Sequence, residues 1–530
     1  GICGPVTITI DSGTYTDRLV LNKIPGTNSE DTVLIQGTER TDCILQNKAN
    51  SVYNQQTLLL NGTSHTTIKE LTINVLDSNI GVGIQLINTA YSQIDHCNVN
   101  MIKTPKGDKL FGIAGIGARH NVFETGYGGN HSSFFNNTIV GGTSSITYYG
   151  ESGLPANLSS FRNNTLTDFK AHGMDLKNLE DLEVINNKIS SRSNSGAIGL
   201  EVSSSSTLLI NSNHISNCWR GLILNGINPY NSGGIPSLLS NNMIITPLTG
   251  LTGGDIVASS NLNIYHNSFS SSGASNFVLN RSDSCDIRSN IFNHTRGGIV
   301  FHVGDSGGLN ASNTLDYNNY YSPFSTSNPY IIKIDSNTYR NVSDWFKADT
   351  VINRNSFYKR PGFLNNNDLH IDSTGNLSGP YLNISRDIDN DLRCSIFPTI
   401  GADQYTPQIF TDLLKPDVIC TSGCLTYTLP PIKPFLNSNY ATNWVIDSIS
   451  VKTKAGYASK NWIYSSPSST NGWIKFCPDS TELDSSFTLF LIYRDLTGAQ
   501  CFTTFSAYIH VGDKPDASFT VSEKELCYGD

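Results

Sequence analysis

Residues 134–139 read Phe-Phe-Asn-Asn-Thr-Ile, and residues 161–166 read Phe-Arg-Asn-Asn-Thr-Leu. In both stretches an apolar residue is followed three positions later by Asn and two positions after that by a second apolar residue. Residues on one face of a continuous strand are separated by even numbers, whereas these apolar residues are five apart. The chain must therefore bend between them. Asn suits such a bend because it tolerates the left-handed region and its amide can bond to the backbone.

The same unit recurs at a nearly constant spacing. Successive asparagines from Asn137 to Asn319 are separated by 27, 23, 26, 29, 25, 23 and 29 residues. Segments this short cannot form separate cores and must stack. Asn100 fits the pattern upstream, and Asn319 fits it less well downstream. We expect a hydrogen-bonded ladder of Asn137, Asn164, Asn187, Asn213, Asn242, Asn267 and Asn290.

Each unit also carries a second short strand, usually after Gly, as in Gly173-Met174-Asp175-Leu176 and Gly221-Leu222-Ile223-Leu224. Helical signals between the strands are nearly absent. Short strands at this period, separated by Ser, Gly and Asn, are typical of a parallel β-solenoid. The sequence therefore predicts an all-β fold built on a parallel β-helix.

Several stretches resemble the right-handed parallel β-helix proteins of the pectate-lyase-like superfamily. They are the opening from Gly4 through Gly13-Thr14-Tyr15 to Ile24-Pro25-Gly26, the Asn-Asn-x-apolar units, and the closing Asp387-Ile388-Asp389 with Ile400-Gly401-Ala402-Asp403-Gln404-Tyr405. More narrowly, the chain is similar to large exported bacterial surface proteins that continue into immunoglobulin-like and PKD-type domains. The resemblance implies a right-handed coil and a secreted or cell-surface protein, but its motifs mark fold better than chemistry.

The composition changes near residue 405. Of 57 asparagines, 52 lie in residues 1–405 and 5 in residues 406–530. Beyond residue 405, alternating segments such as Phe487 to Tyr493 are typical of sandwich strands. We predict a right-handed parallel β-helix over 1–405, an immunoglobulin-like β-sandwich over 406–512, and the truncated start of a further PKD or immunoglobulin-like domain over 513–530.

Charge and cysteine content limit the partners. The 35 basic and 44 acidic residues give a net charge of −9, which disfavours nucleic-acid binding through a basic surface. No apolar run approaches the roughly 20 residues that span a bilayer. Among the 11 cysteines, only Cys420 and Cys424 have a zinc-like spacing, so disulfides are favoured over zinc. The expected partners are a carbohydrate, a cell-surface ligand, or other chains of an extracellular assembly.

The best local cluster of catalytic residue types is Lys170, His172 and Asp175. The resemblance implies enzymes as one alternative, because many parallel β-helices of that superfamily are polysaccharide lyases or glycoside hydrolases with a groove along one sheet. The specific motifs are missing, however. Ile94-Asp95-His96-Cys97 is similar to the Trp-Ile-Asp-His segment of pectate lyases, but Gln93 replaces the Trp. Ordinary loop-stabilising roles are the competing interpretation of the cluster.

The middle residue of each Gly-led strand is expected to point away from the core. These residues are Gln85, Asp175, Gly199, Ile223, Val257, Val278 and Val300. The last four, Ile223, Val257, Val278 and Val300, predict an aliphatic interface stripe covered by a loop, a domain or another chain. The same alignment places Lys177 beside Glu201.

Asp387, Asp389 and Asp391, backed by Asp403, could ligate calcium through carboxylate oxygens. A turn that ends the solenoid is the competing interpretation. From the aliphatic stripe and the missing motifs, the first functional prediction is a non-enzymatic scaffold or adhesion module of a large secreted cell-surface protein, or of a multi-chain appendage. The alternative is a polysaccharide lyase or glycoside hydrolase acting in a groove on the β-helix.

Overall fold

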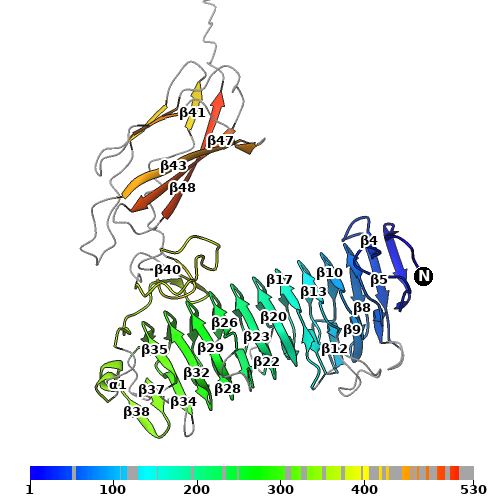
Figure 1. The fold of residues 1–530 in the computed structure, drawn as a ribbon, viewed down its shortest axis with the longest axis horizontal. Helices are drawn as coiled ribbons and strands as arrows, with labels where there is room; N and C mark the ends of the chain where they lie inside the picture. Colours follow the sequence, from blue (N-terminus) through cyan, green and yellow to red (C-terminus); the bar gives the residue numbers. More distant parts are fainter. Residues whose placement is uncertain are drawn as a thin grey trace, which may run out of the picture. The chain divides into compact units, whose positions relative to one another are not determined.

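The computed structural model describes residues 1–49, 55–107, 109–115, 129–151, 153–192, 196–228, 234–246, 250–304, 312–323, 331–348, 354–371, 377–394 and 398–404, together with backbone strands between residues 417 and 512. The chain divides into two compact units, Gly1–Arg393 with Phe397–Tyr405 and Cys394–Ile396 with Thr406–Asp530 (Figure 1). Within the described part of the chain, no helix has the length and apolar character needed to cross a membrane.

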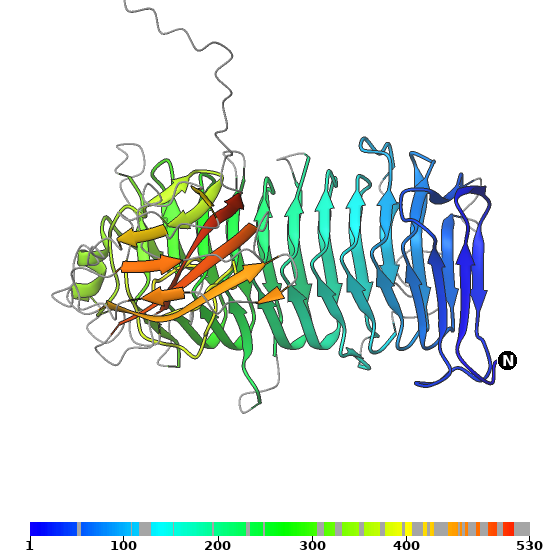
Figure 2. The same ribbon diagram turned by 90° about the horizontal axis from the view of Figure 1, so that it is seen from above.

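Three long parallel sheets form the first unit, and successive strands of each sheet come from successive coils (Figures 1 and 2). Sheet A contains β1 (Val6–Ile10), β4 (Val33–Gly37), β7 (Thr66–Lys69), β10 (Gln93–Asp95), β13 (Ser133–Phe135), β17 (Ser160–Arg162), β20 (Leu179–Ile185), β23 (Ser206–Asn211), β26 (Ser237–Ser240), β29 (Ser260–Tyr265), β32 (Asp283–Arg288) and β35 (Thr314–Asp316), with β16 (Ala156–Asn157) beside β20. Sheet B contains β2 (Gly13–Thr16), β5 (Cys43–Asn47), β8 (Thr72–Val75), β11 (Asn98–Asn100), β14 (Thr138–Val140), β18 (Thr165–Thr167), β21 (Lys188–Ser190), β24 (His214–Ser216), β27 (Met243–Thr246), β30 (Ser268–Ser271), β33 (Ile291–His294) and β36 (Asn319–Tyr321). Sheet C contains β3 (Leu19–Asn22), β6 (Gln56–Asn61), β9 (Ile80–Ile87), β12 (Lys109–Gly115), β15 (Ser144–Tyr149), β19 (His172–Lys177), β22 (Ile198–Ser203), β25 (Arg220–Asn225), β28 (Thr252–Val257), β31 (Ser275–Asn280), β34 (Ile299–Gly304) and β37 (Ile332–Ile334), with β38 (Asn337–Tyr339) antiparallel at its end. The prediction of an all-β chain built on a parallel β-helix is confirmed.

The turn from sheet A to sheet B explains the spacing of five in the repeat. Phe134 lies in sheet A, Ile139 lies in sheet B, and both are fully buried. The positive φ falls on the residue before the ladder asparagine, at Asn136 (54°) and Asn163 (57°). The bend expected at the ladder asparagine itself therefore lies one residue earlier, which leaves the ladder side chain free to point along the solenoid axis.

The ladder asparagines are buried and bonded from coil to coil. The Asn164 backbone N–H and side-chain Nδ2 both donate to Asn187 Oδ1, at 2.9 and 3.0 Å. Asn164 Nδ2 also donates to the Phe134 carbonyl at 2.9 Å. The same inter-coil pattern joins Asn137, Asn164, Asn187, Asn213, Asn242, Asn267 and Asn290.

The two ends of the ladder differ from the expected ones. Upstream, the equivalent position is Cys97, whose N–H donates to Asn137 Oδ1 at 2.9 Å. Asn100 instead lies in β11 with an exposed side chain. Downstream, Asn290 Nδ2 donates to Asn318 Oδ1 at 3.0 Å, so Asn318 rather than Asn319 continues the ladder.

The core between the sheets is closed by aromatic side chains toward the last coils. Phe292 stacks on Tyr320 with ring centroids 5.5 Å apart. Trp345, on the short helix α1 (Val342–Ala348), is 1% exposed and lies edge-on to Tyr320 at 5.5 Å. Helix α1 therefore covers the end of the apolar core.

Glycines at the start of the sheet C strands allow this sheet to approach sheet B. A Cβ on Gly199 would lie 2.3 Å from Ile215 Cγ2 and 2.6 Å from the Gly221 carbonyl oxygen. A Cβ added to Gly173 or Gly221 would likewise overlap an isoleucine of sheet B and a backbone oxygen of the next strand. The residue after each glycine, such as Met174, is also fully buried. Two consecutive residues thus face the core, and the outward position comes two residues after the glycine.

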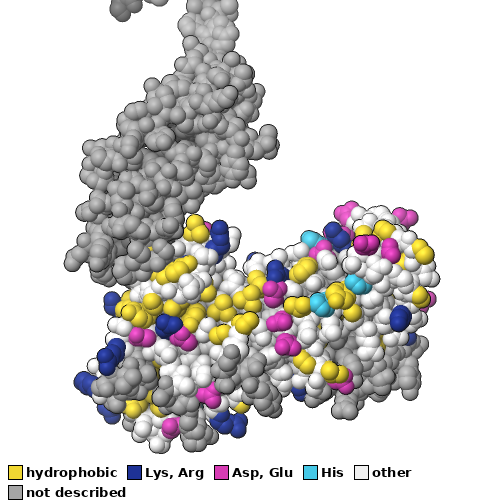
Figure 3. All heavy atoms as spheres, viewed as in Figure 1, with side chains coloured by type: hydrophobic (Ala, Val, Ile, Leu, Met, Phe, Trp, Pro, Cys, Tyr) yellow, Lys and Arg dark blue, Asp and Glu magenta, His cyan; other side chains and the backbone are white. Residues whose placement is uncertain are grey.

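The segment after α1 folds back over the outer face of sheet B. It carries the hairpin of β39 (Phe363–Asn365) and β40 (Asp368–Ile371). Leu369 and Ala402 bury Met243 and Ile245, while Ile371, Leu377 and Ile400 bury Ile291. A covered aliphatic surface therefore exists on sheet B. Elsewhere, Figure 3 shows apolar side chains in a band along the visible side of the β-helix, with charged side chains beside it.

The second unit is described by its strands alone. One sheet has the order β41 (Asp417–Cys420), β48 (Phe502–Gly512), β47 (Ser486–Asp495), β43 (Trp444–Thr453) and β44 (Gly456–Tyr457). The other has the order β42 (Leu425–Thr428), β46 (Trp473–Phe476) and β45 (Trp462–Tyr464). The immunoglobulin-like sandwich over 406–512 stays a prediction, and the domain start predicted over 513–530 lies outside the described residues.

Candidate functional site

The outer face of sheet C is defined by the strand register. Asp175 pairs with Thr147 on one side and Glu201 on the other, Glu201 pairs with Ile223, and Ile223 pairs with Asp255. The full outward column reads Gln85, Ala114, Thr147, Asp175, Glu201, Ile223, Asp255, Val278 and His302. The first three are buried, so the accessible part of the column begins at Asp175 and is rich in charge.

The predicted aliphatic stripe is therefore wrong. On three strands the outward residue differs from the expected one. Glu201 takes the place of Gly199 on β22, Asp255 that of Val257 on β28, and His302 that of Val300 on β34. Val300 is fully buried in the core. Ile223 and Val278 do lie in the column, whereas Val257 lies two residues further along its strand. For Gly199 and Val300 the error arose because two consecutive residues of the strand face the core, Gly199 with Leu200 and Val300 with Phe301, which shifts the alternation by one.

Four side chains from three neighbouring strands meet at the start of the accessible column. Tyr149, the last residue of β15, donates a hydrogen bond from its hydroxyl to Asp175 Oδ2. His172, the first residue of β19, has Nε2 3.3 Å from Glu201 Oε2, and both side chains are 26% exposed. The cluster thus combines two carboxyl groups on adjacent strands, each held by a different partner.

The environment shifts three of these groups. Burial raises the pKa of Asp175, the Tyr149 hydrogen bond opposes this, and the nearby Glu201 charge adds to it, so the pKa lies above its ordinary value. Burial lowers the pKa of His172, but the hydrogen bond to Glu201 and the charge of Asp175 outweigh it, so the net direction is upward. Burial and the charge of Asp175 raise the pKa of Tyr149. Asp175 is therefore easier to protonate than an ordinary aspartate, and the charged form of His172 is more stable than that of an ordinary histidine.

Further charged and aromatic groups continue along the same face. Arg220, the first residue of β25, has Nη1 3.4 Å from Asp255 Oδ2. The Arg220 guanidinium also lies over the ring of Trp219, 5.1 Å from its centroid. An aromatic ring beside a held guanidinium is the kind of surface that a sugar chain with polar and anionic groups can contact.

The predicted catalytic trio is divided by the structure. His172 and Asp175 lie on the outer face of sheet C, in the cluster with Tyr149 and Glu201. Lys170 is exposed in the turn before β19, where its backbone N–H donates to the Gly142 carbonyl. Lys177 pairs in register with Ser203, so the expected alignment with Glu201 is shifted by two residues.

Sequence reasoning missed Tyr149, Arg220 and Asp255 as members of this face. Counting two residues on from each glycine of sheet C would have found Asp255 from Gly253, and Glu201 from Gly199. Tyr149 has no such signal, because β15 has Ser145 where the next strands β19, β22 and β25 have Gly.

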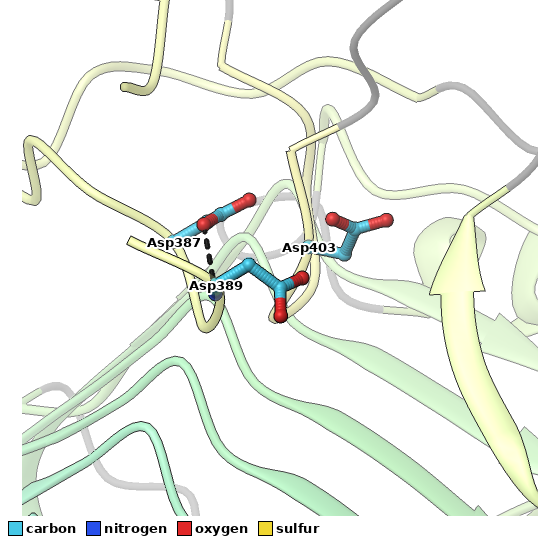
Figure 4. A group of neighbouring side chains, drawn as sticks. All are labelled: Asp387, Asp389 and Asp403. Atoms are coloured by element: carbon cyan, nitrogen blue, oxygen red, sulfur yellow. Dashed lines mark hydrogen bonds between the residues drawn. The ribbon is translucent and has the colours of Figure 1, made fainter. Parts of the chain in front are cut away.

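The acidic residues near the end of the first unit form a second group. Asp387, Asp389 and Asp403 have ligand oxygens within 4.8 Å of one another (Figure 4). Asp403, which was expected to back the acidic run, belongs to this group, whereas Asp391 does not. Asp387 Oδ1 accepts the backbone N–H groups of Asp389 and Asp391, at 3.0 and 2.8 Å. The set suits calcium by ligand type, while these hydrogen bonds also give Asp387 a role in holding the turn.

Comparisons with known proteins give likeness of fold at low sequence identity. No protein-family model matches the chain, and no curated protein matches it. The Dettilon tailspike protein gp208 is 12% identical with a TM-score of 0.40, over 92% of this chain and 72% of that one. A point mutant of the periplasmic alginate epimerase AlgG is 13% identical with a TM-score of 0.28, over 61% of this chain and 78% of that one. A mannuronic acid specific polysaccharide family 6 lyase from human gut microbiota is 8% identical with a TM-score of 0.32, over 66% of this chain and 90% of that one.

The prediction of a non-enzymatic scaffold or adhesion module is overturned. It depended on the missing motifs and on the aliphatic stripe, and the register replaces that stripe by a column in which Asp175, Glu201 and Asp255 carry charge. The solved structures of similar fold include proteins named as an epimerase and a lyase, and the tailspike gp49 of an Acinetobacter baumannii phage, which is named a capsular polysaccharide depolymerase.

Proposed function

We propose that this chain is a carbohydrate-active enzyme, a polysaccharide lyase or glycoside hydrolase, that acts on the outer face of sheet C. The observation that carries the proposal is the cluster of Tyr149, His172, Asp175 and Glu201. Cleavage of a glycosidic link needs groups that donate and accept protons beside the bond. Here a carboxyl group with a raised pKa and a carboxylate paired with His172 stand on adjacent strands.

The shape of the sheet supports a long substrate. The accessible outward residues continue from Asp175 through Asp255 to His302 on successive strands. Adjacent strands are about 4.8 Å apart, so this row extends over several sugar units. We propose a polysaccharide ligand that the protein meets outside the cell or at its surface.

To test this, the full protein chain is incubated with a panel of purified polysaccharides. The panel contains uronate polymers, bacterial capsular polysaccharides and neutral glucans. New reducing ends report any cleavage, and ultraviolet absorbance of an unsaturated uronide reports elimination. We expect the wild-type chain to cleave at least one member and the double variant Asp175→Asn/Glu201→Gln to lose the activity.

The matched control is Glu183→Gln, because Glu183 lies on sheet A with Ser160 and Arg162 as partners. This variant is expected to cleave at the wild-type rate. The proposal is wrong if the wild-type chain cleaves nothing in the panel, or if the double variant, shown to be folded by circular dichroism, cleaves as well as the wild type.

A further inference from the structure

The two carboxyl groups of the cluster differ in their surroundings. Asp175 accepts a hydrogen bond from Tyr149, and its charged form is disfavoured by burial and by Glu201. Glu201 is paired with His172, whose charged form is favoured. Neighbouring carboxyl groups with different environments are the arrangement that separates an acid from a base or nucleophile.

The spacing of the pair is limited by the β-helix itself. Asp175 and Glu201 are register partners on β19 and β22, so their backbones are separated by one strand spacing, about 4.8 Å. Retaining glycosidases hold their two carboxyl groups about 5 to 5.5 Å apart, whereas inverting enzymes need about 6.5 to 9.5 Å to admit a water. The next acid in the column, Asp255, lies two strands from Glu201, about 10 Å away, and is paired with Arg220.

These residues are less suited to elimination, the reaction that a lyase catalyses. It needs a side chain that removes a proton next to the substrate carboxylate. Two candidates beside the carboxyl pair are His172 and Tyr149, and the pKa of each is raised, which favours the protonated form over the base that elimination needs.

Resting on the proposed function, we infer that the chain is a glycoside hydrolase that retains the anomeric configuration, with Glu201 as nucleophile and Asp175 as general acid and base. In the first step a Glu201 oxygen bonds to the anomeric carbon, the glycosidic C–O bond breaks, and the Asp175 carboxyl proton passes to the leaving oxygen. In the second step the Asp175 carboxylate takes a proton from a solvent water, the resulting hydroxide bonds to the anomeric carbon, and the Glu201 ester bond breaks. Tyr149 and His172 are positioning residues, one for each carboxyl group.

The experiment follows the anomeric configuration of the first product by proton NMR, with the polysaccharide that the panel identifies. Retention is expected, and inversion would overturn the inference while leaving the proposed function intact. An unsaturated product would overturn it in the same way, because it indicates a lyase. If no member of the panel is cleaved, the proposed function fails and the inference fails with it.

Nucleophile replacement gives a second measurement. Glu201→Ala is expected to be inactive on a para-nitrophenyl glycoside of the sugar at the cleavage point, and added azide is expected to restore turnover and yield a glycosyl azide. Asp175→Asn is expected to lower kcat/KM on the polysaccharide by about 100- to 10,000-fold. Failure of azide to restore a folded Glu201→Ala variant would exclude Glu201 as the nucleophile.

The positioning role of Tyr149 has its own readout. The charged and titratable groups around Asp175 are Tyr149 on β15, His172 and Lys177 on β19, and Glu201 on β22. The Tyr149 hydrogen bond lowers the pKa of Asp175, so Tyr149→Phe is expected to move the alkaline limb of the pH–rate profile to higher pH. A loss of rate with an unmoved limb would leave Tyr149 a packing role only.

Discussion

Asn187 shows how one residue type can hold successive coils together. Its Oδ1 accepts from the Asn164 backbone N–H and from Asn164 Nδ2, and its own Nδ2 donates to Asn213 Oδ1 and to the Phe161 carbonyl. All of these groups are buried, and each loses a hydrogen bond without the amide; Asn164 Nδ2 keeps its bond to the Phe134 carbonyl, and Asn213 Oδ1 keeps its bond from the Asn187 backbone N–H. An amide is needed because its oxygen accepts from one coil while its nitrogen donates to others.

We predict that Asn187→Ala lowers the free energy of unfolding by about 3 kcal/mol or more, because several buried polar groups lose partners at about 1 to 3 kcal/mol each. The measurement is urea unfolding followed by circular dichroism. Asn225→Ala is the matched control, because Asn225 is exposed at the end of β25. Equal unfolding midpoints for the two variants would contradict the ladder as a source of stability.

At the scale of elements, the sheet C strands show how packing sets which side chains reach the surface. Gly199 and Leu200 both face the core, so Glu201 becomes the outward residue of β22. On β19, Gly173 and Met174 face the core in the same way, so Asp175 points outward, in register with Glu201. The glycine column thus positions the candidate catalytic pair although it touches neither carboxyl group.

We predict that Gly199→Ala destabilises the protein by about 1 to 3 kcal/mol, because its methyl group would overlap Ile215 and a backbone oxygen that cannot move aside. Differential scanning calorimetry or urea unfolding measures the change. Gly304→Ala is the control: nothing lies closer than 3.6 Å to the added carbon, so we expect a change within about 0.5 kcal/mol. Two variants of equal stability would show that the close approach of the sheets is not maintained.

At the scale of the whole β-helix, the segment after α1 joins parts of the chain that are distant in sequence. Arg393 is buried and donates to Asn241 Oδ1 and to the carbonyls of Thr399, Gly401 and Ala402. His370 lies between Asp368 and Asp389, with Nε2 2.8 Å from Asp389 Oδ2. The segment is therefore held by ionic groups as well as by its apolar contacts with sheet B.

This arrangement makes stability depend on pH. The hydrogen bond to Asp389 is the largest influence on His370, and with Asp368 it raises the pKa of His370 to about 10 against the opposing effect of burial. The folded state therefore binds a proton that the unfolded chain releases near its ordinary pKa. This contribution is complete below the ordinary value of 6.5 and disappears as the pH rises through about 10. Burial raises the pKa of Asp403 to about 6, so its smaller proton-linked contribution disappears as the pH rises from the ordinary value of 3.8 through about 6.

We predict that the melting temperature of the β-helix falls between neutral pH and about pH 10. The melting temperature of the His370→Gln variant is expected to fall less over the same range. Thermal melts across a pH series measure both slopes. A His370→Gln variant with the wild-type slope would show that the pH dependence has another source.

The sequence by itself determined the coil. The apolar and asparagine positions recur within each unit, so local spacing sufficed to predict the all-β fold, the parallel solenoid and the residues that form its ladder. Even so, it misplaced the bend by one residue, because both Asn136 and Asn137 suit a turn and only the coil decides which one points inward.

Only the tertiary structure decided the outer face of sheet C. Two consecutive core-facing residues shift the alternation, and this shift comes from glycines packed against sheet B rather than from any pattern within the strand. Asp175 and Glu201 are 26 residues apart in sequence, and only the register of β19 against β22 brings them side by side. Charged residues that looked isolated in the sequence become one site because a β-helix converts equal positions on successive coils into neighbours in space.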